Sequence, residues 1–273
     1  MTFPFVKGHG TRNDFIILPD LDGSRHGDLS PAVVRELCDR RAGLGADGVL
    51  RVLRGNVDGG ADWFMDYRNA DGSVSQMCGN GVRVFARYLA EEGLVDPAAP
   101  LAVDTRAGVK EVRFCPDGEI SVDMGRPTVG GMVPLRADGR WFEAMSVDMG
   151  NPHAVVHVDS LDEAGALTAS PVYRPIDFPD GVNVEFVHTV GDNELAMRVY
   201  ERGAGETLSC GTGACASVAA AMAVAVERGA GSRRASSYTV NVRGGVLTVR
   251  SDDAEHLHLK GDAALVAEGT WTA

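Results

Sequence analysis

The sequence has few aromatic residues, little positive charge and no long apolar run. Aromatic side chains make up only 6% of its 273 residues, which gives no support for a surface that stacks nucleobases. The net charge of −12 argues against a general binder of nucleic acids or anionic membranes. No apolar stretch approaches the ~20 residues of a membrane-spanning helix. We therefore expect no nucleic-acid or membrane partner, but a small acidic ligand is still compatible with this composition.

Lysine and cysteine are also scarce. The three lysines, Lys7, Lys110 and Lys260, lie in no motif typical of a Schiff-base lysine, so pyridoxal phosphate is not expected. The five cysteines are irregularly spaced and odd in number, which argues against a disulfide framework. The first residues lack the charged start, apolar core and cleavage site of a signal peptide. These absences favour a cytoplasmic protein with free thiols and no cofactor.

A metal site also lacks support. Cys210 and Cys215 are not spaced like the ligand pairs of a zinc site, and Cys215 is expected inside a helix. His256 and His258 alternate on a predicted strand and therefore share a face. We interpret them as surface residues, with metal binding as the weaker alternative.

The most informative feature is a pair of matched turns. Cys78-Gly79-Asn80-Gly81 and Cys210-Gly211-Thr212-Gly213 both read Cys-Gly-x-Gly, and each precedes a helical pattern. A cysteine just ahead of a helix lies against unsatisfied backbone N–H groups and the positive end of the helix dipole, a setting that favours the thiolate. The glycines let the backbone approach a ligand, so the same turn can hold a carboxylate.

These turns belong to an internal repeat of about 130 residues. Each half offers a polar turn, strands, a polar residue at a strand end, the Cys-Gly-x-Gly turn and a helix. Asn69 precedes Cys78 by nine residues, and Glu201 precedes Cys210 by nine. A repeat of this length fits a duplicated domain better than a solenoid unit. Two such halves facing each other would bring both cysteines into one cleft.

We therefore predict an α/β (α+β) fold of two pseudo-symmetric domains, each with a curved sheet around a central helix. The first covers residues 1–124 and is completed by a C-terminal strand at 262–273. The second covers residues 125–261, with the Gly- and Pro-rich segment 125–131 as the crossing.

The periodicity predicts the individual elements. Helices are expected after Ser30-Pro31, with Cys38 on the buried face, after each Cys-Gly-x-Gly turn, and in part of 161–173. Strands are expected at 15–18, 49–53, 61–68, 101–105, 110–114, 119–123, 154–158, 182–190, 194–200, 237–243, 246–250 and 255–260.

A helix-terminal thiolate can act as a nucleophile, a metal ligand, a redox centre or a base. Nucleophilic catalysis with His153 as partner would leave the second cysteine unexplained. A thioredoxin-like Cys-x-x-Cys is absent. Base chemistry uses both cysteines symmetrically: one thiolate removes a proton from one face of a carbon, and the other thiol protonates the opposite face. The result is inversion of a stereocentre.

The residues also resemble a known family, diaminopimelate epimerase. The motifs that carry the resemblance are Asn13-Asp14-Phe15, Asn69–Ser73, Ser75–Gly81, Met149–His153, Val182-Asn183, Tyr200–Thr207 and Cys210–Cys215. The resemblance implies a pyridoxal-phosphate-independent epimerase of two pseudo-symmetric domains. It implies interconversion of LL- and meso-diaminopimelate in lysine and peptidoglycan synthesis, without a cofactor and usually as a homodimer.

The resemblance also implies roles for single residues. Cys78 and Cys210 resemble the two catalytic acid/bases. The turns that hold the reacting carboxylate correspond to Gly79, Asn80, Gly211 and Thr212. The remaining substrate contacts correspond to Asn13, Asn69, Asn151, Asn183, Glu201 and Arg202. Arg202 can pair with a distal carboxylate and Glu201 with an ammonium group. Asp14 and His153 would support the thiols.

The chain departs from the family pattern at three positions. Arg12 stands where many members carry Gly, and Thr212 stands where Ser is common. Gly48 stands where many members carry a Gln that contacts the substrate, so that contact is absent or replaced.

Two alternatives remain open. A proline racemase or hydroxyproline epimerase also uses paired cysteines, but typically has Cys-Gly-His in its first turn, where this chain has Asn80. A non-catalytic amino-acid-binding module or a thiol redox protein belongs to a different class. The first has no need of two activated thiols, and the second has no need of the asparagines.

Overall fold

The computed structural model describes residues 2–55, 59–229 and 236–272, and the chain divides into two compact units. Unit 1 consists of Met1–Val122 and Gly261–Ala273, and unit 2 consists of Asp123–Lys260. The division falls two residues before the boundary drawn from the sequence. Residues 1 and 273 of the expected first half lie outside the described part.

Unit 1 contains a run of paired strands and two helices. Its elements are β1 (Thr2–Gly10), β2 (Asn13–Pro19), α1 (Pro31–Cys38), β3 (Gly48–Arg54), β4 (Trp63–Asn69), α2 (Gly79–Glu91), β5 (Leu101–Asp104), β6 (Lys110–Phe114), β7 (Ile120–Asp123) and β18 (Ala264–Thr272). The strands pair in the order β18-β1-β2-β3-β4-β5-β6-β7. Strand β1 was not predicted, because residues 2–10 show no clear alternation.

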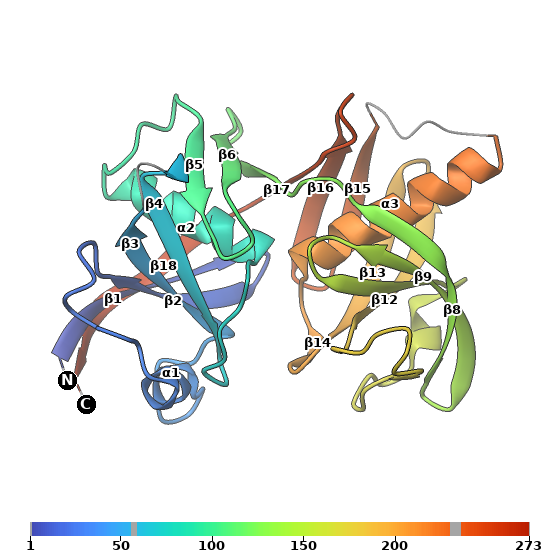
Figure 1. Ribbon diagram of the computed structural model, residues 1–273, viewed down its shortest axis with the longest axis horizontal. Helices are drawn as coiled ribbons and strands as arrows, with labels where there is room; N and C mark the ends of the chain where they lie inside the picture. Colours follow the sequence, from blue (N-terminus) through green and yellow to red (C-terminus); the bar gives the residue numbers. More distant parts are fainter. Residues whose placement is uncertain (1, 56–58, 230–235, 273) are drawn as a thin grey trace. The chain divides into compact units, whose positions relative to one another are not determined.

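Helix α2 is the central element of unit 1. It contacts β1, β2, β3, β4 and β18, and Figure 1 shows it lying against these strands. The predicted face of Val82, Phe85, Ala86 and Leu89 is completely buried. The helix ends just before Gly93, whose φ of 66° is the left-handed conformation that glycine adopts easily at a helix C-terminus. The sequence prediction for this helix is confirmed.

The short helix α1 also follows its sequence signals. The side chain of Ser30 accepts a hydrogen bond from the Val33 N–H, and Pro31 occupies the first helical position. Cys38, the last residue of this helix, is buried in the core as expected, and burial raises the pKa of its thiol to about 12. A protonated thiol in an apolar core behaves as a small hydrophobic side chain.

Unit 2 repeats the plan. Its elements are β8 (Thr128–Ala137), β9 (Arg140–Asp148), β10 (Pro152–His157), η2 (Leu161–Ala164), β11 (Val172–Tyr173), β12 (Asn183–Gly191), β13 (Glu194–Glu201), β14 (Gly205–Thr207), α3 (Gly211–Glu227), β15 (Ser237–Val242), β16 (Gly245–Ser251) and β17 (Leu257–Gly261). Helix α3 contacts β8, β9, β10, β12, β13 and β16 (Figure 1). Residues 211–220 of this helix are all buried, and each of them is apolar or small, which suits a helix enclosed by strands.

The strand pairings show the duplication directly. In unit 2 the strands pair in the order β8-β9-β10-β12-β13-β15-β16-β17. From one end to the other, both units have two antiparallel pairs, a parallel pair, an antiparallel pair, a parallel pair and two antiparallel pairs. Strands β2 and β3 therefore correspond to β10 and β12. The predicted two-domain fold from an internal duplication is confirmed.

One sequence interpretation was wrong in detail. Segment 125–131 was interpreted as the crossing between domains, but its last part belongs to strand β8. Strand β8 pairs with β9 through an irregular step between Val129 and Met132, so its glycines lie at a bulge rather than in a linker. The hairpin of β8 and β9 was not predicted, because the glycines mask its alternation. Among the described residues, no helix is long and apolar enough to cross a membrane.

Candidate active site

In unit 1 the first Cys-Gly-x-Gly turn forms the start of α2. Cys78 is the N-cap, and its Sγ accepts a hydrogen bond from the Gly81 N–H at 3.4 Å. The thiol also lies 3.7 Å from Oδ1 of Asn13, to which it can donate. The Cys78 side chain is half-buried, so a ligand can reach it.

Two asparagines predicted to contact the substrate are held by a network around this turn. Asn80 donates to Oδ1 of Asn13 at 3.2 Å, and Asn13 donates to Oδ2 of Asp47 at 2.7 Å. The guanidinium of Arg83 donates to Oδ1 of Asn80 at 3.0 Å and is completely buried. Asp47 and Arg83 were missed by the sequence reasoning, although an arginine inside an apolar helix is a signal that it has a buried partner.

Asp14 and Asn69 form their described side-chain contacts with residues outside the first Cys-Gly-x-Gly turn. Asp14 forms ion pairs at 2.7 Å with Lys7 and Arg40. Burial alone would raise the pKa of Asp14, but the hydrogen bonds from the two cations outweigh it and lower the pKa. The support of Asp14 for Cys78 stays a prediction. Asn69 ends β4 and donates to Oγ of Ser73 at 2.9 Å.

In unit 2 the second turn begins α3 in the same way. Cys210 is the N-cap, and its Sγ accepts from the Gly213 N–H at 3.3 Å and lies 3.4 Å from Oγ1 of Thr212. Its side chain is buried, with 5% of its surface exposed.

The electrostatic setting of Cys210 differs from the expectation. Burial raises the pKa of its thiol well above the ordinary value, and the negative charges of Glu201 and Glu185 raise it further. The hydrogen bonds from Thr212 and Gly213 act in the opposite direction but are weaker. The helix N-terminus is expected to favour the thiolate, but burial and the two carboxylates act in the opposite direction at Cys210.

Glu201 and Arg202 lie at the end of β13. Glu201 accepts a hydrogen bond from the Thr207 hydroxyl and is hydrogen-bonded to Cys210, and burial raises the pKa of its carboxyl. The backbone N–H of Arg202 donates to Oδ1 of Asn183 at 2.9 Å, and its exposed guanidinium donates to the carbonyl of Asp180.

The side chains of Asn151 and His153 connect Thr212 of the second turn to a buried glutamate. Asn151 donates to Oγ1 of Thr212 at 3.4 Å, and its Oδ1 lies 3.1 Å from Nε2 of His153. Nδ1 of His153 lies 2.7 Å from Oε1 of Glu185, and both of these side chains are completely buried. Glu185 was not predicted as a site residue, although an acidic residue inside the apolar strand 183–187 is a visible signal.

The duplication aligns the two sets of site residues. Phe15 pairs with Gly48 across β2 and β3, and His153 pairs with Asn183 across β10 and β12. Asn13 and Asn151 each lie two residues before the first member of these pairs. The equivalent of Asn183 in unit 1 is therefore Gly48, and Asn69 and Glu201 each end the next strand.

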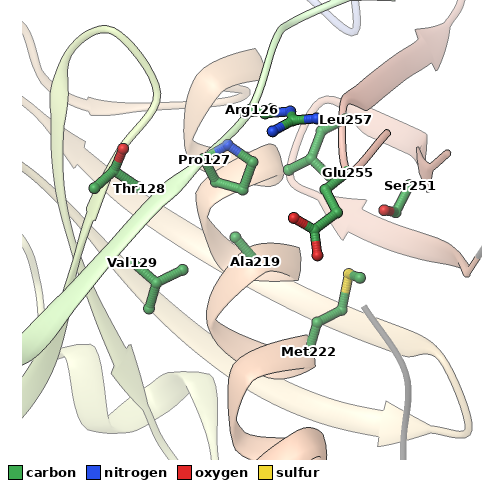
Figure 2. Close-up of a pocket in the computed structure, with 9 residues that line it drawn as sticks. All are labelled: Arg126, Pro127, Thr128, Val129, Ala219, Met222, Ser251, Glu255 and Leu257. Carbon is green, nitrogen blue, oxygen red and sulfur yellow. The ribbon is translucent and has the colours of Figure 1, made fainter. Parts of the chain in front are cut away.

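Unit 2 also has a pocket of about 270 Å³ away from the turn. It is lined by Arg126, Pro127, Thr128, Val129, Ala219, Met222, Ser251, Glu255 and Leu257 (Figure 2). Ala219 and Met222 lie in the middle of α3, beyond the turn at its start. None of the predicted site residues lines this pocket.

The described residues include no group of three or more side chains suited to a metal ion. His256 lies 2.9 Å from Asp123, and His258 lies 2.9 Å from Asp252. Each imidazole is thus paired with a different carboxylate, as surface histidines commonly are.

Comparison with known proteins gives the family. The diaminopimelate epimerase family model matches residues 5–130 and 145–266, and therefore most of both units. This chain belongs to the diaminopimelate epimerase family. It is 50% identical over 279 residues to a diaminopimelate epimerase of Streptomyces coelicolor, covering 97% of this chain and 94% of that protein. It is also 50% identical to a diaminopimelate epimerase of Thermobifida fusca, covering 97% and 96%. Members of this family are isomerases, and so is this protein.

A solved structure supports the fold. The chain superposes on a hydroxyproline epimerase of Agrobacterium vitis with a TM-score of 0.71 and 18% identity, covering 98% of this chain and 92% of that one. At this identity the likeness shows a common fold. The choice between the epimerase families rests on the family match and on the relatives that share half of their residues with this chain.

Proposed function

We propose that this protein interconverts LL- and meso-diaminopimelate by a two-base mechanism, with Cys78 and Cys210 as the acid/base pair. The observation that carries the proposal is the equivalence of the two cysteines. Each caps the central helix of its unit, and each accepts a hydrogen bond from the N–H of the glycine three residues later. One thiolate would remove the Cα proton, and the other thiol would protonate the opposite face.

The environments of the thiols suggest their starting roles. The buried Cys210, whose pKa is raised by desolvation, suits the thiol that delivers a proton. The half-buried Cys78 would then remove the proton from the isomer that binds in this state. Turnover exchanges these roles, so the reverse reaction starts with a Cys210 thiolate.

The other site residues would hold the substrate. The backbone N–H groups of Gly79, Asn80, Gly211 and Thr212 lie at helix N-termini, where a carboxylate and its developing negative charge are stabilised. Asn13, Asn69, Asn151 and Asn183 would donate to the substrate. Arg202 would bind the distal carboxylate, and Glu201, which is hydrogen-bonded to Cys210, would bind an ammonium group of the substrate.

Substrate assays test the assignment. The purified protein is incubated with LL-diaminopimelate and, separately, with L-proline and trans-4-hydroxy-L-proline, and the stereoisomers are separated by chiral chromatography. We expect conversion of diaminopimelate to a mixture of LL and meso forms without added cofactor. Epimerisation of either proline substrate, with diaminopimelate untouched, would contradict the proposal. The variant Cys78→Ala provides the control for contaminating epimerase.

The family resemblance also suggests a cellular location, a pathway and an assembly state. We propose a cytoplasmic enzyme of lysine and peptidoglycan synthesis that acts on a small-molecule substrate and forms a homodimer. The mass in solution checks the dimer, because a chain of 28.8 kDa should sediment with twice that mass. A monomer at assay concentration would remove this part of the proposal.

A further inference from the structure

Glu185 is a buried acidic side chain to which the reaction described above gives no role. It lies in β12 between Val184 and Phe186, which pack into the core cluster of unit 2. Its own side chain lies on the other face, beneath the start of α3. A Cβ added to Gly213 would come within 2.6 Å of its Oε1. Gly213 thus leaves the space that lets a carboxylate approach the Cys210 turn.

The only side chain that the described contacts hydrogen-bond to Glu185 is a histidine. Oε1 of Glu185 lies 2.7 Å from Nδ1 of His153, and both side chains have no exposed surface. Its second oxygen, Oε2, has no hydrogen-bond partner among the described residues. Burying a carboxylate with so few donors costs free energy, so this pair is poorly explained as a device for stability.

Unit 1 shows that the fold does not require a polar pair at this place. The positions equivalent to His153 and Glu185 are Phe15 and Leu50, which are both completely buried. They lie beneath the first turn as the polar pair lies beneath the second. A Cβ added to Gly81 would come within 3.2 Å of Leu50 and 3.6 Å of Phe15. An apolar pair therefore supports one cysteine turn, and the ionisable pair in unit 2 is specific to Cys210.

A continuous chain of contacts connects Glu185 to that cysteine. From Glu185 it passes through His153 at 2.7 Å and through Asn151 at 3.1 Å. It continues to Thr212 at 3.4 Å and ends at Sγ of Cys210, a further 3.4 Å away. All five residues belong to unit 2.

The hydrogen bonds of this chain can run in two directions. In one, a ring protonated on both nitrogens donates to Glu185 and to Oδ1 of Asn151, the amide donates to Thr212, and its hydroxyl donates to a thiolate. In the other, the Asn151 amide is flipped, so that its oxygen faces Thr212 and its nitrogen faces His153. Cys210 then donates to the Thr212 hydroxyl, this hydroxyl donates to the amide oxygen, and the amide nitrogen donates to Nε2 of a neutral ring. Each direction gives every contact one donor and one acceptor, and Nδ1–H donates to Glu185 in both.

We propose that Glu185 is a positioning residue for Cys210, acting through His153, Asn151 and Thr212. Its carboxylate holds the histidine ring with Nδ1–H towards β12, so that Nε2 always faces Asn151. The direction of the hydrogen bonds in the contact chain then changes with the ionisation state of Cys210, and the Thr212 hydroxyl donates a hydrogen bond to the thiolate. This inference rests on the proposed acid/base role of Cys210, whose thiolate must form in one direction of turnover in spite of its burial.

Because Glu185 carries a negative charge, a direct charge effect and a positioning role predict opposite effects of Glu185→Gln on the ionisation of Cys210. Among the described residues, the carboxylates of Glu201 on β13 and Glu185 on β12 act on Cys210, and His153 on β10 interacts with both of them. If Glu185 acted only as a nearby negative charge, Glu185→Gln would ease ionisation of Cys210. If it acts through the histidine, the same change removes the support of the thiolate and makes ionisation harder.

The experiment measures the reactivity of Cys210 in the full chain without substrate. Wild type, Glu185→Gln and the control Glu255→Gln are treated with iodoacetamide across a range of pH, and the peptide with Cys210 is quantified by mass spectrometry. Glu255→Gln removes an exposed carboxylate from the same unit. We expect Glu185→Gln to slow alkylation of Cys210 at neutral pH about tenfold and to shift its pH profile upward. The control should match wild type. Unchanged or faster alkylation in Glu185→Gln would overturn the proposal.

A double variant separates positioning from stability. His153→Phe with Glu185→Leu copies the apolar pair of unit 1. We expect a melting temperature at least equal to that of wild type, because replacing a buried ionisable pair by packed apolar residues is often neutral or stabilising. Alkylation of Cys210 should nevertheless be slowed, and kcat should fall more than KM changes. Failure of this variant to fold would assign the pair a structural role and overturn the proposal.

Alkylation needs no substrate, so the two proposals can fail separately. Slowed alkylation in Glu185→Gln, combined with a wild-type protein inactive on diaminopimelate, would refute the proposed function and support the contact chain. Full epimerase activity in wild type, combined with unchanged alkylation in Glu185→Gln, would do the reverse.

Discussion

Gly48 and Asn183 occupy equivalent positions, each at the first residue of the fourth strand in the pairing order of its unit. Asn183 uses its side chain to accept the backbone N–H of Arg202. Gly48 has none, and a Cβ there would come within 2.6 Å of the Arg68 carbonyl oxygen and of the Tyr67 ring. The neighbours of Gly48 thus leave no room for the glutamine that many family members carry at this point.

A first prediction concerns this close approach. Gly48→Ala should destabilise the protein by about 1–3 kcal/mol, because the added methyl group meets a backbone oxygen that cannot move freely. Urea unfolding measures the effect. The control is Gly131→Ala, a strand glycine with no atom within 4 Å of the added Cβ, which should change stability by less than about 0.5 kcal/mol. Equal stability of the two variants would contradict the packing described for β3.

A second prediction concerns the buried charges of unit 1. Arg51, with 8% of its side chain exposed, lies 2.6 Å from Asp20 and 3.7 Å from Asp66. Arg51→Ala should cost about 3–5 kcal/mol in the free energy of unfolding, because it leaves buried carboxylates without this cation. Arg113→Ala, which breaks an exposed pair with Glu111, should cost at most about 1 kcal/mol. Similar losses in the two variants would count against the buried network.

The same network predicts a pH dependence. Burial alone would raise the pKa values of Asp20 and Asp66, but hydrogen bonds from their partners outweigh it and lower both below the ordinary value of 3.8. Because the folded pKa values are depressed, this stability is complete above the unfolded pKa and is lost as the pH falls through the folded values. Unfolding of wild type at decreasing pH should show the loss below pH 3.8, and Arg51→Ala should show less of it.

A third prediction concerns the distal end of the substrate. Arg202→Ala should lower kcat/KM for diaminopimelate by about 10- to 100-fold, the effect of losing one hydrogen bond between charged groups. Arg174→Ala, which removes an exposed arginine paired with Asp177 in the same unit, is the control and should match wild type. Steady-state kinetics distinguish the two. A wild-type kcat/KM in Arg202→Ala would remove the main support for the distal carboxylate.

The sequence predicted the features that have local signals. Capping residues and periodicity were enough for α1, α2 and α3, and the spacing of Asn69, Glu201 and the two cysteines revealed the duplication. Strands β1 and β8 were missed because glycines interrupt their alternation, and β9 was missed with its hairpin partner β8. Some pairings also join segments that lie far apart in the chain. The pairing of β1 with β18, for example, joins the two ends of the described chain.

The electrostatic setting of the candidate site was less predictable from the sequence than the places of its residues at the ends of strands and helices. Cys210 was placed correctly at a helix N-terminus, but its burial beside Glu201 and Glu185 depends on strands that come together only in the fold. The sequence shows that a helix follows Cys210, which favours the thiolate, but it does not show that the folded strands bury this side chain. Glu185 was overlooked for the same reason, since its partner His153 lies 32 residues earlier in the chain.

A fourth prediction separates the roles of the two cysteines. Cys78→Ala and Cys210→Ala should each abolish epimerisation, with a loss of at least about 10²-fold, because a thiol cannot reach the carbon from the opposite face. Each variant keeps one base, so any residual exchange of Cα hydrogen should affect opposite isomers in the two variants. Chiral chromatography and proton NMR in D₂O follow both. Near-normal epimerisation by either variant would contradict the two-base assignment.

Isotope incorporation by the wild-type enzyme tests the central claim most directly. The reaction is started in D₂O from one isomer and stopped early, and deuterium at Cα is measured in the product and in the recovered substrate by mass spectrometry. If Cys78 and Cys210 serve opposite faces, the product carries deuterium from the second thiol while the unreacted substrate stays largely unlabelled. Strong early labelling of the recovered substrate would show that a single base returns solvent hydrogen to both faces, and would contradict the account.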